Sequence, residues 1–233
     1  MSDDDAMMEV FADAEAASEA AAAIIRSSLR QGLAKAGRAS FAGSGGSSPR
    51  ETYRLMAHAD LNWARVDVTL TDERWVEPTS PDSNERMLRE NLLVGPAAQA
   101  RFIPLWRDEC TPESAAARVD LALAILPPFD VVMLGMGEDG HIASLFPGNP
   151  ALDEGLDPDG PRLCLCVPKA VPVPPQTRVT LTLRALLNAE TIILLTSGEA
   201  KKQTLQAAFD GKDLPVRALL TQDRAPVRVL WSP

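Results

Sequence analysis

A histidine is the residue of this chain best placed to do chemistry. His141 is one of two histidines, and it follows Asp139-Gly140 shortly after an apolar run that ends at Met136. An imidazole titrates at about pH 6.5, so it can take up and return a proton near neutral pH, and a neighbouring carboxylate can orient the ring. We therefore expect His141 to act in catalysis, whereas His58 falls at the end of a predicted helix and is expected on the surface.

A glycine-rich loop is the second candidate. Ser44-Gly45-Gly46-Ser47-Ser48 stands between a short apolar run, Ala39–Ala42, and a predicted helix that starts at Pro49. Small residues ahead of a helix let backbone N–H groups point at an anion, which the helix dipole also favours. A tight turn explains the loop equally well when it is taken alone. The loop has neither the Gly-Lys-Ser/Thr of a P-loop nor GxGxxG spacing, so it favours a small phosphate ester over a nucleotide.

Charged residues follow two further apolar runs. Asp72-Glu73-Arg74 comes shortly after Val66–Leu70, and Arg74 carries a fork of donors that suits a phosphate. Taken alone, the triplet is more typical of a solvated surface cluster. Lys201 lies in the first turn of a predicted helix, where most lysines are simply solvated.

The elements that position these residues alternate between strand-like and helical patterns. The predicted strands are Ala39–Ala42, Val66–Leu70, Phe129–Met136, Thr191–Thr196 and Val227–Trp231, and the predicted helices are Met8–Lys35 (ending at Gly37), Pro49–His58, Ser83–Leu93, Pro112–Ile125 and Ala200–Phe209. Such alternation predicts an α/β fold, a three-layer α/β/α sandwich with a mostly parallel sheet. Ligands of open parallel sheets bind beyond the carboxyl ends of the strands. Four strands deliver a polar loop to that edge, which predicts the active site there.

Composition and charge narrow the class of protein. The chain has 233 residues, of which 45% are hydrophobic and 24% charged, as in an ordinary globular protein, and we expect residues 1–233 to form one domain. With a net charge of -9, the chain lacks the positive electrostatic field that attracts nucleic acid, so we expect it to bind none. No apolar run approaches the roughly 18 residues that span a bilayer. The acidic start Ser2–Asp5 lacks the basic region of a signal peptide, so we expect a cytoplasmic protein that binds no membrane.

The three cysteines give no sign of a disulfide or a metal centre. Cys164 and Cys166 stand two apart in a strand-like run, facing the same way and too far apart for a disulfide. No Cys or His partner lies at zinc spacing from them or from Cys110. We interpret all three as reduced core residues and expect no metal.

These blocks together resemble the 6-phosphogluconolactonases, within the wider group of sugar-phosphate isomerases and deaminases. The resemblance rests on Ser44–Pro49 with Tyr53, on Asp72-Glu73-Arg74 followed by Pro81–Asn84, on Gly135–Pro147, and on Arg178–Leu183, in the order of the family. It implies a modified Rossmann fold and hydrolysis of 6-phospho-D-glucono-1,5-lactone to 6-phosphogluconate without a cofactor. The implied partner is the small-molecule lactone, and we expect a monomer or a weak homo-oligomer.

The resemblance also assigns site residues. His141 would activate the attacking water, Asp139 would orient His141, and Asp72 is included as a third catalytic residue. The residues implied to bind the substrate and its phosphate are Ser44, Gly45, Gly46, Ser47, Ser48, Arg74, Asn84, Arg178 and Lys201.

The related glucosamine-6-phosphate deaminases are the main alternative, and a non-catalytic sugar-phosphate sensor is another. The deaminases carry a Glu before the proline where this chain has Phe146, and they tend to have Tyr in place of Arg74, so both positions favour the lactonase. Ile142 is the residue that the deaminases favour, and Glu138 replaces a common Pro. Val173 stands where the lactonases have a Lys, and Lys169 would take the place of that Lys. Both residues belong to the Pro-rich segment Pro168–Pro175, which we expect to be a rigid loop over or near the site.

Overall fold

The computed structural model describes residues 8–168 and 176–233 of the chain. The predictions that concern the first five residues, Lys169 and Val173 therefore lie outside the described residues, as does most of the Pro-rich segment.

A seven-stranded sheet forms the centre of the molecule. Every adjacent pair of its strands is parallel. The order across it is β1 (Met8–Val10), β10 (Val227–Ser232), β9 (Ile192–Ser197), β6 (Val131–Leu134), β2 (Ala39–Gly43), β3 (Val66–Leu70) and β5 (Arg101–Ile103). The central strands β2, β3 and β6 are buried along their whole length, which is why their sequences read as continuous apolar runs.

A second, smaller sheet was not predicted. It is antiparallel, in the order β4 (Asp72–Arg74), β8 (Arg178–Leu181), β7 (Cys164–Val167). The triplet Asp72-Glu73-Arg74 is therefore a strand, and the interpretation of it as a solvated surface cluster is wrong, because Asp72 and Glu73 are buried. All three cysteines are free, as expected, but only Cys164 is buried in the core, whereas Cys166 and Cys110 are half-buried. Among the described residues, no group of three or more His, Cys, Asp or Glu side chains is arranged to hold a metal ion.

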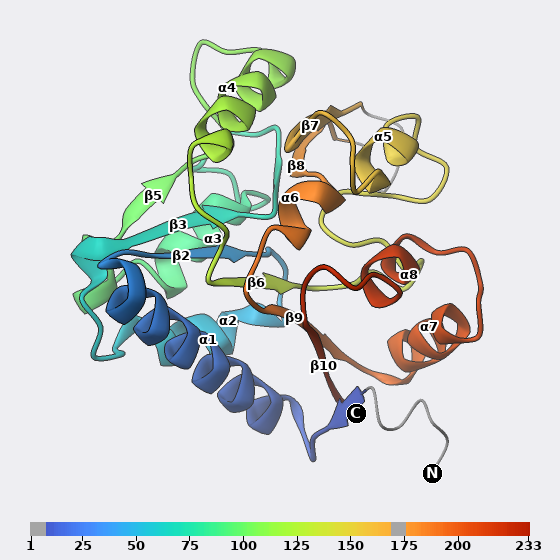
Figure 1. Cartoon of the computed structure of the whole chain (residues 1–233), viewed down its shortest axis with the longest axis horizontal. Helices are drawn as coiled ribbons and strands as arrows, with labels where there is room; N and C mark the ends of the chain where they lie inside the picture. The colour runs from blue at the N-terminus through green and yellow to red at the C-terminus, as the bar shows by residue number, and fades with distance from the viewer. Residues whose placement is uncertain (1–7, 169–175) are drawn as a thin grey trace.

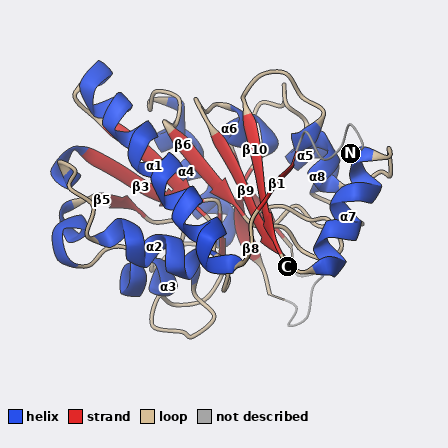
Figure 2. Cartoon of the chain, turned by 90° about the horizontal axis from the view of Figure 1, so that it is seen from below, coloured by secondary structure: helices blue, strands red, loops and turns tan. Residues whose placement is uncertain are grey.

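Helices lie on both sides of the main sheet, so the predicted three-layer α/β/α sandwich is confirmed (Figure 1). The described helices are α1 (Ala14–Ala36), α2 (Pro49–Ala57), α3 (Asn84–Asn91), α4 (Pro112–Ala124), α5 (Leu152–Leu156), α6 (Leu183–Leu187), α7 (Glu199–Phe209) and α8 (Pro215–Leu220), with short 3-10 turns at Trp63–Arg65 and Gly95–Gln99. The long helix α1 lies in front of the main sheet in Figure 2 and packs against β2, β9 and β10. On the other side, α4 packs against β7 and β8 of the small sheet.

The chain start differs from its prediction. The Ala-rich pattern predicted one helix from Met8 to Lys35, but Met8–Val10 forms strand β1 beside β10, and the helix begins only at Ala14. Asp13 separates the two, because its side chain accepts a hydrogen bond of 2.8 Å from the N–H of Ala16 and so caps the helix. The predicted end is confirmed, since Gly37 takes a left-handed φ of 71°. None of the described helices is long and apolar enough to cross a membrane.

Candidate active site

The carboxyl ends of β2, β3, β6 and β9 converge on one cleft of about 260 Å³, as the sequence predicted. The residues that line it come from the loops after these four strands and from the small sheet; they are Ser44–Pro49, Asp72, Arg74, Asn84, Gly135–Gly137, His141, Ala143, Arg178 and Lys201. Every predicted site residue is therefore in the cleft except Asp139, which lies behind His141.

Asp139 and His141 form a pair at the end of β6. The Nδ1 atom of His141 lies 2.6 Å from Oδ1 of Asp139, and the same oxygen accepts a hydrogen bond from the backbone N–H of His141. Burial raises the pKa of the Asp139 carboxyl, but the hydrogen bond and the charge of His141 lower it by more, so the pKa lies below its ordinary value. A proton on Nδ1 leaves the lone pair on Nε2, for which no described residue supplies a hydrogen bond.

Gly137 makes room for this pair. A Cβ atom at Gly137 would lie 2.2 Å from Cε1 and Nδ1 of His141 and 2.6 Å from Oδ1 of Asp139. The loop closes through a hydrogen bond from the N–H of Gly137 to the carbonyl of His141. It is also held from outside, because the Thr204 hydroxyl of α7 donates to the carbonyl of Glu138 at 2.8 Å. The departure at Glu138 thus leaves the His–Asp pair in place.

Phe146 lies against the inner side of the histidine. The two ring centroids are 4.4 Å apart, and Phe146 is only 1% exposed. The guanidinium of Arg178 lies on the same phenyl ring, 5.5 Å from its centroid. The position where the deaminases carry a carboxylate is therefore filled here by a buried apolar ring.

Asp72 is fixed by Ser144, a residue that sequence reasoning did not select. The Ser144 hydroxyl donates to Oδ2 of Asp72 at 2.6 Å, and the Ser144 N–H donates to the hydroxyl of Thr180. The preceding residue, Ala143, takes a left-handed φ of 48°, which is strained for a residue with a side chain. Ser144 and Thr180 both fall inside the sequence blocks that carried the family resemblance, and this was their one signal.

The glycine loop is held open by side chains around it. The Tyr53 hydroxyl donates to the carbonyl of Ser44 at 2.7 Å, and the Asn84 side chain occupies the space that a Cβ at Gly45 would need. Ser48 makes no side-chain cap on α2, so the N-terminus of that helix stays open beside the cleft. The hydroxyl of Ser44 is buried and has no hydrogen-bond partner among the described residues.

Two arginines face the cleft from the small sheet. Arg74 of β4 lies directly opposite Arg178 of β8. Burial lowers the pKa of Arg178 and the charge of Arg74 adds to this effect, while the attraction of Asp72, 3.7 Å away, opposes it. Each guanidinium has a buried Nε with no partner among the described residues. Because buried donors are normally paired and like charges repel, this arrangement suits a bound anion.

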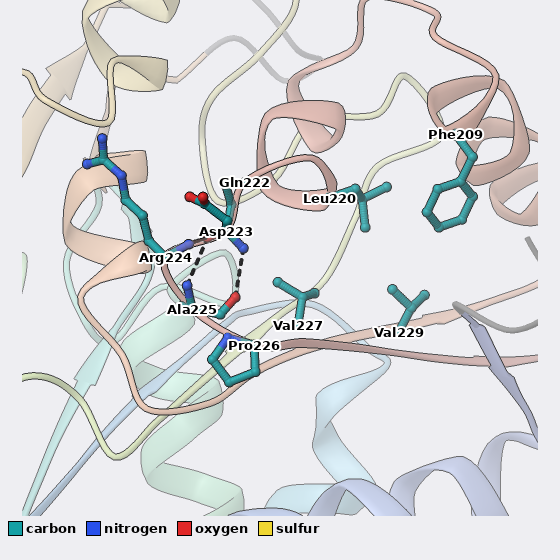
Figure 3. A pocket seen from close by; sticks show the side chains of 9 residues that line it. All are labelled: Phe209, Leu220, Gln222, Asp223, Arg224, Ala225, Pro226, Val227 and Val229. Carbon is teal, nitrogen blue, oxygen red and sulfur yellow. Dashed lines mark hydrogen bonds between the residues drawn. The ribbon is translucent and has the colours of Figure 1, made fainter.

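A larger pocket lies at the opposite end of the strands, near the amino end of β10, and lacks the His–Asp pair and the facing arginines (Figure 3). It has a volume of about 440 Å³ and lies around the start of β10, where Phe209, Leu220 and Val229 form an apolar wall. The amide of Gln222 there accepts from the N–H groups of Arg224 and Ala225. The guanidinium of Arg224 is paired with Asp159. Gln222 and Arg224 are thus already engaged within the chain, and no histidine lines this pocket.

The chain is similar to known proteins over nearly its whole length. The family model described as "Glucosamine-6-phosphate isomerases/6-phosphogluconolactonase" matches residues 12–231. A 6-phosphogluconolactonase of Caulobacter vibrioides is 45% identical over 97% of both chains. The crystal structure of a 6-phosphogluconolactonase from Shewanella baltica is 37% identical with a TM-score of 0.91, again over 97% of both chains. A monomeric glucosamine-6-phosphate deaminase has the same fold at 19% identity, with a TM-score of 0.77 over 96% of both chains. The chain belongs to the glucosamine-6-phosphate isomerase/6-phosphogluconolactonase family.

Proposed function

We propose that this chain is a 6-phosphogluconolactonase, which hydrolyses 6-phospho-D-glucono-1,5-lactone to 6-phospho-D-gluconate in the oxidative pentose phosphate pathway. The observation that carries the proposal is one cleft that holds both a carboxylate-oriented histidine and two arginines with unpaired donors. The first suits a general base, and the second suits the phosphate of the substrate. The 45% identity to a named lactonase over nearly the whole chain supports the same activity.

In the proposed reaction, Nε2 of His141 takes a proton from a water molecule as the water oxygen attacks the lactone carbonyl. The carbonyl oxygen then carries the negative charge of the tetrahedral intermediate, which backbone N–H groups of the glycine loops stabilise. When the intermediate collapses, the bond to the ring oxygen breaks and His141 returns its proton to that oxygen. The imidazolium exists only between these two steps, and Asp139 stabilises it throughout, 2.6 Å away. These reaction steps need no oxidant, metal or cofactor.

We assign the phosphate to the end of the cleft formed by Arg74, Arg178 and the open N-terminus of α2, with Lys201 as a further cation. Ser44–Ser48 supply the backbone of that helix start. In this assignment, most of the residues that bind the anion lie in the part of the chain that the structure describes. It also lessens the importance of Val173, which stands where the lactonases have a Lys.

The deaminase alternative is disfavoured by Phe146, because a phenyl ring cannot carry the proton that sugar ring opening requires. The direct test is to assay the purified chain with freshly generated 6-phosphogluconolactone and, in parallel, with glucosamine 6-phosphate. We expect hydrolysis of the lactone well above its spontaneous rate and no release of ammonia. Ammonia release without lactone hydrolysis would replace this proposal by the deaminase, and tight binding without turnover of either compound would replace it by a sensor.

We further propose that the enzyme works in the cytoplasm as a monomer or weak homo-oligomer and binds no nucleic acid. Its net charge of -9 and the small size of its substrate support this view. Sedimentation at micromolar concentration, with and without DNA, tests the oligomeric state and the expected lack of nucleic-acid binding.

A further inference from the structure

Glu73 is a buried acid next to the cleft that the proposed reaction does not use. It is 1% exposed, yet its carboxylate accepts four hydrogen bonds. Oε1 accepts from the backbone N–H groups of Arg74 at 2.7 Å and Asn84 at 2.8 Å, and Oε2 accepts from the N–H of Glu85 at 2.7 Å and the hydroxyl of Ser83 at 3.0 Å. All four neighbours are donors, so the surroundings are built for the ionised form of Glu73.

Three of these donors form the start of helix α3. Ser83 is its N-cap, and Asn84 and Glu85 are its first two residues. The N-terminus of a helix carries unpaired N–H groups and a partial positive charge, and the Glu73 carboxylate satisfies both from the neighbouring strand β4. The first turn of α3 is therefore anchored to β4 by this side chain.

Asn84 transmits that position to the cleft. Its Nδ2 donates to the carbonyl of Asp72 at 2.9 Å, and its Oδ1 lies where a Cβ of Gly45 would be, only 1.9 Å from that point. Asn84 thus packs directly onto the glycine loop and itself lines the cleft. A shift of the first turn of α3 would move Asn84 and release the loop.

We propose that Glu73 is a positioning residue of the active site: its ionised carboxylate holds the first turn of α3, and thereby holds Asn84 against the glycine loop in the shape that binds substrate. The inference rests on the proposed lactonase activity for its kinetic readout.

The charge on Glu73 changes within the neutral range. Burial raises its pKa to about 7, although the hydrogen bonds from Asn84, Glu85, Arg74 and Ser83 pull the pKa down. The charged groups around it are Asp72 and Arg74 on β4, Arg178 on β8, Glu85 on α3 and Asp82 in the loop before it. A protonated Glu73 keeps its contact with Ser83 only if the Ser83 hydroxyl accepts instead of donating, and its neutral oxygens hold the backbone N–H groups of α3 more weakly than a carboxylate does. Substrate binding should therefore weaken as the pH falls through 7.

Folding stability should move in the opposite direction, which separates this role from a merely structural one. Because the folded-state pKa lies above the ordinary value of 4.5, the folded chain binds the proton more tightly than the unfolded chain. The contribution of Glu73 to stability is thus fully present below pH 4.5 and is lost as the pH rises through 7. When the pH falls, protonation of Glu73 should therefore weaken substrate binding but should not lower the melting temperature.

The test compares Glu73→Gln with wild type from pH 5.5 to 8.5, and the matched control is Glu85→Gln. Glu85 is also buried and lies in the same first turn of α3, but its carboxylate pairs with Arg89 at 2.8 Å and, among the described residues, accepts no hydrogen bond from the backbone of that turn. In wild type we expect KM to rise as the pH falls through 7. In Glu73→Gln we expect KM to be raised by about tenfold at pH 8 and to lose this pH dependence, with kcat nearly unchanged. Glu85→Gln should keep the wild-type KM profile; a flat wild-type KM profile, or a Glu73→Gln profile equal to that of wild type, overturns the proposal.

A double-mutant cycle that combines Glu73→Gln with Asn84→Ala tests whether Glu73 acts on the cleft through Asn84. If Glu73 acts through Asn84, the double variant should raise KM no further than Asn84→Ala alone. If the two increases in KM multiply instead, Glu73 does not act through Asn84 and the proposal is wrong.

Amide hydrogen exchange provides a readout that needs no turnover and no variant. In wild type, the protection factors of the Asn84 and Glu85 amides should fall as the pH drops below 7. If the lactone is not hydrolysed but this pattern appears, the proposed function fails while the role of Glu73 at α3 stands. If the lactone is hydrolysed and protection does not change with pH, the present inference fails alone, even if Glu73→Gln does not fold.

Discussion

The imidazole of His141 packs on the phenyl ring of Phe146, with the two centroids 4.4 Å apart and the planes inclined at 53°. The contact gives the histidine an apolar inner wall, while Asp139 holds its Nδ1 from the other side. One face of the ring is thus packed, one nitrogen is paired, and the other nitrogen is left for the substrate water. This arrangement suits a base that must be neutral at the start of each turnover and charged only briefly.

Replacing Phe146 by Glu should disturb this balance. A carboxylate beside the ring stabilises the protonated imidazole, so the acid side of the pH–rate profile should move up by about one pH unit or more. Phe146→Leu, the control, keeps an apolar wall and should leave the profile where it is. Steady-state rates from pH 5 to 9 check this, and an unshifted profile in Phe146→Glu would contradict the assignment of His141 as the base.

His141→Ala should lower kcat by about 10² to 10⁴, the usual contribution of general acid–base catalysis. The side chain is 27% exposed and its loop is held by backbone hydrogen bonds, so the melting temperature should change little. His58→Ala is the matched control, because His58 is exposed at the end of α2, as predicted. A kcat for His141→Ala within a few-fold of wild type would refute the proposed mechanism.

Asp139→Asn should lower kcat by up to about 10⁴-fold, because an amide does not stabilise the imidazolium and can hold the ring in the tautomer that has its proton on Nε2. The pKa of Asp139 lies below its ordinary 3.8, so the group stays ionised through the neutral range. Its contribution to stability is present above pH 3.8 and is lost as the pH falls through the lower folded-state pKa. Melting curves of wild type and variant should therefore differ at pH 6 and converge below pH 3.8; convergence at pH 6 would show that the pair is not formed in solution.

Gly137→Ala tests whether the loop geometry matters as much as the pair. The new methyl group would fall 2.2 Å from the imidazole and must displace it, and a displacement of about 1 Å can cost a factor of about 100 in rate. Gly37→Ala is the control for strain, since Gly37 has a positive φ but open space around it. Gly37→Ala should cost about 1 kcal/mol of stability with unchanged kcat. Equal kcat values for the two variants would show that Gly137 is not needed for the position of His141.

Local signals account for the part of the site that the sequence predicted. The glycine loop, the Asp139–His141 pair and Lys201 each follow an apolar strand within a few residues, so the parallel-sheet rule places them at one edge. Strands that are buried on both faces have nearly continuous apolar sequences. The place of such a strand in the chain can therefore be predicted with little knowledge of the rest of the fold, although its bounds differ: the predicted strand Phe129–Met136 is longer than β6, Val131–Leu134.

Of the small sheet, only the strand that holds Cys164 and Cys166 was expected from the sequence; the sheet itself escaped prediction because its strands are short and its pairing is distant. Arg74 meets Arg178 only because β4 pairs with β8, which is about 100 residues away along the chain. Ser144 donates to Asp72 from the other side of a backbone position, Ala143, that has a left-handed φ. No periodicity encodes such contacts. The family resemblance named Arg178 and Asp72, but it did not supply the reason that they are side by side.

The two arginines make the last prediction, which concerns affinity rather than rate. Arg74→Met and Arg178→Met each remove a cation that lines the cleft, although Arg74 also donates to the carbonyl of Asp82, so they should weaken binding of 6-phosphogluconate by about tenfold or more each. Binding of gluconate, which lacks the phosphate, should not change. Arg224→Met, at the far pocket, is the control and should bind both compounds as wild type does. Competitive inhibition of lactone hydrolysis by each compound measures these affinities. If affinity for gluconate and 6-phosphogluconate falls by the same factor, the arginines hold the sugar and not the phosphate, because only a phosphate contact distinguishes the two ligands.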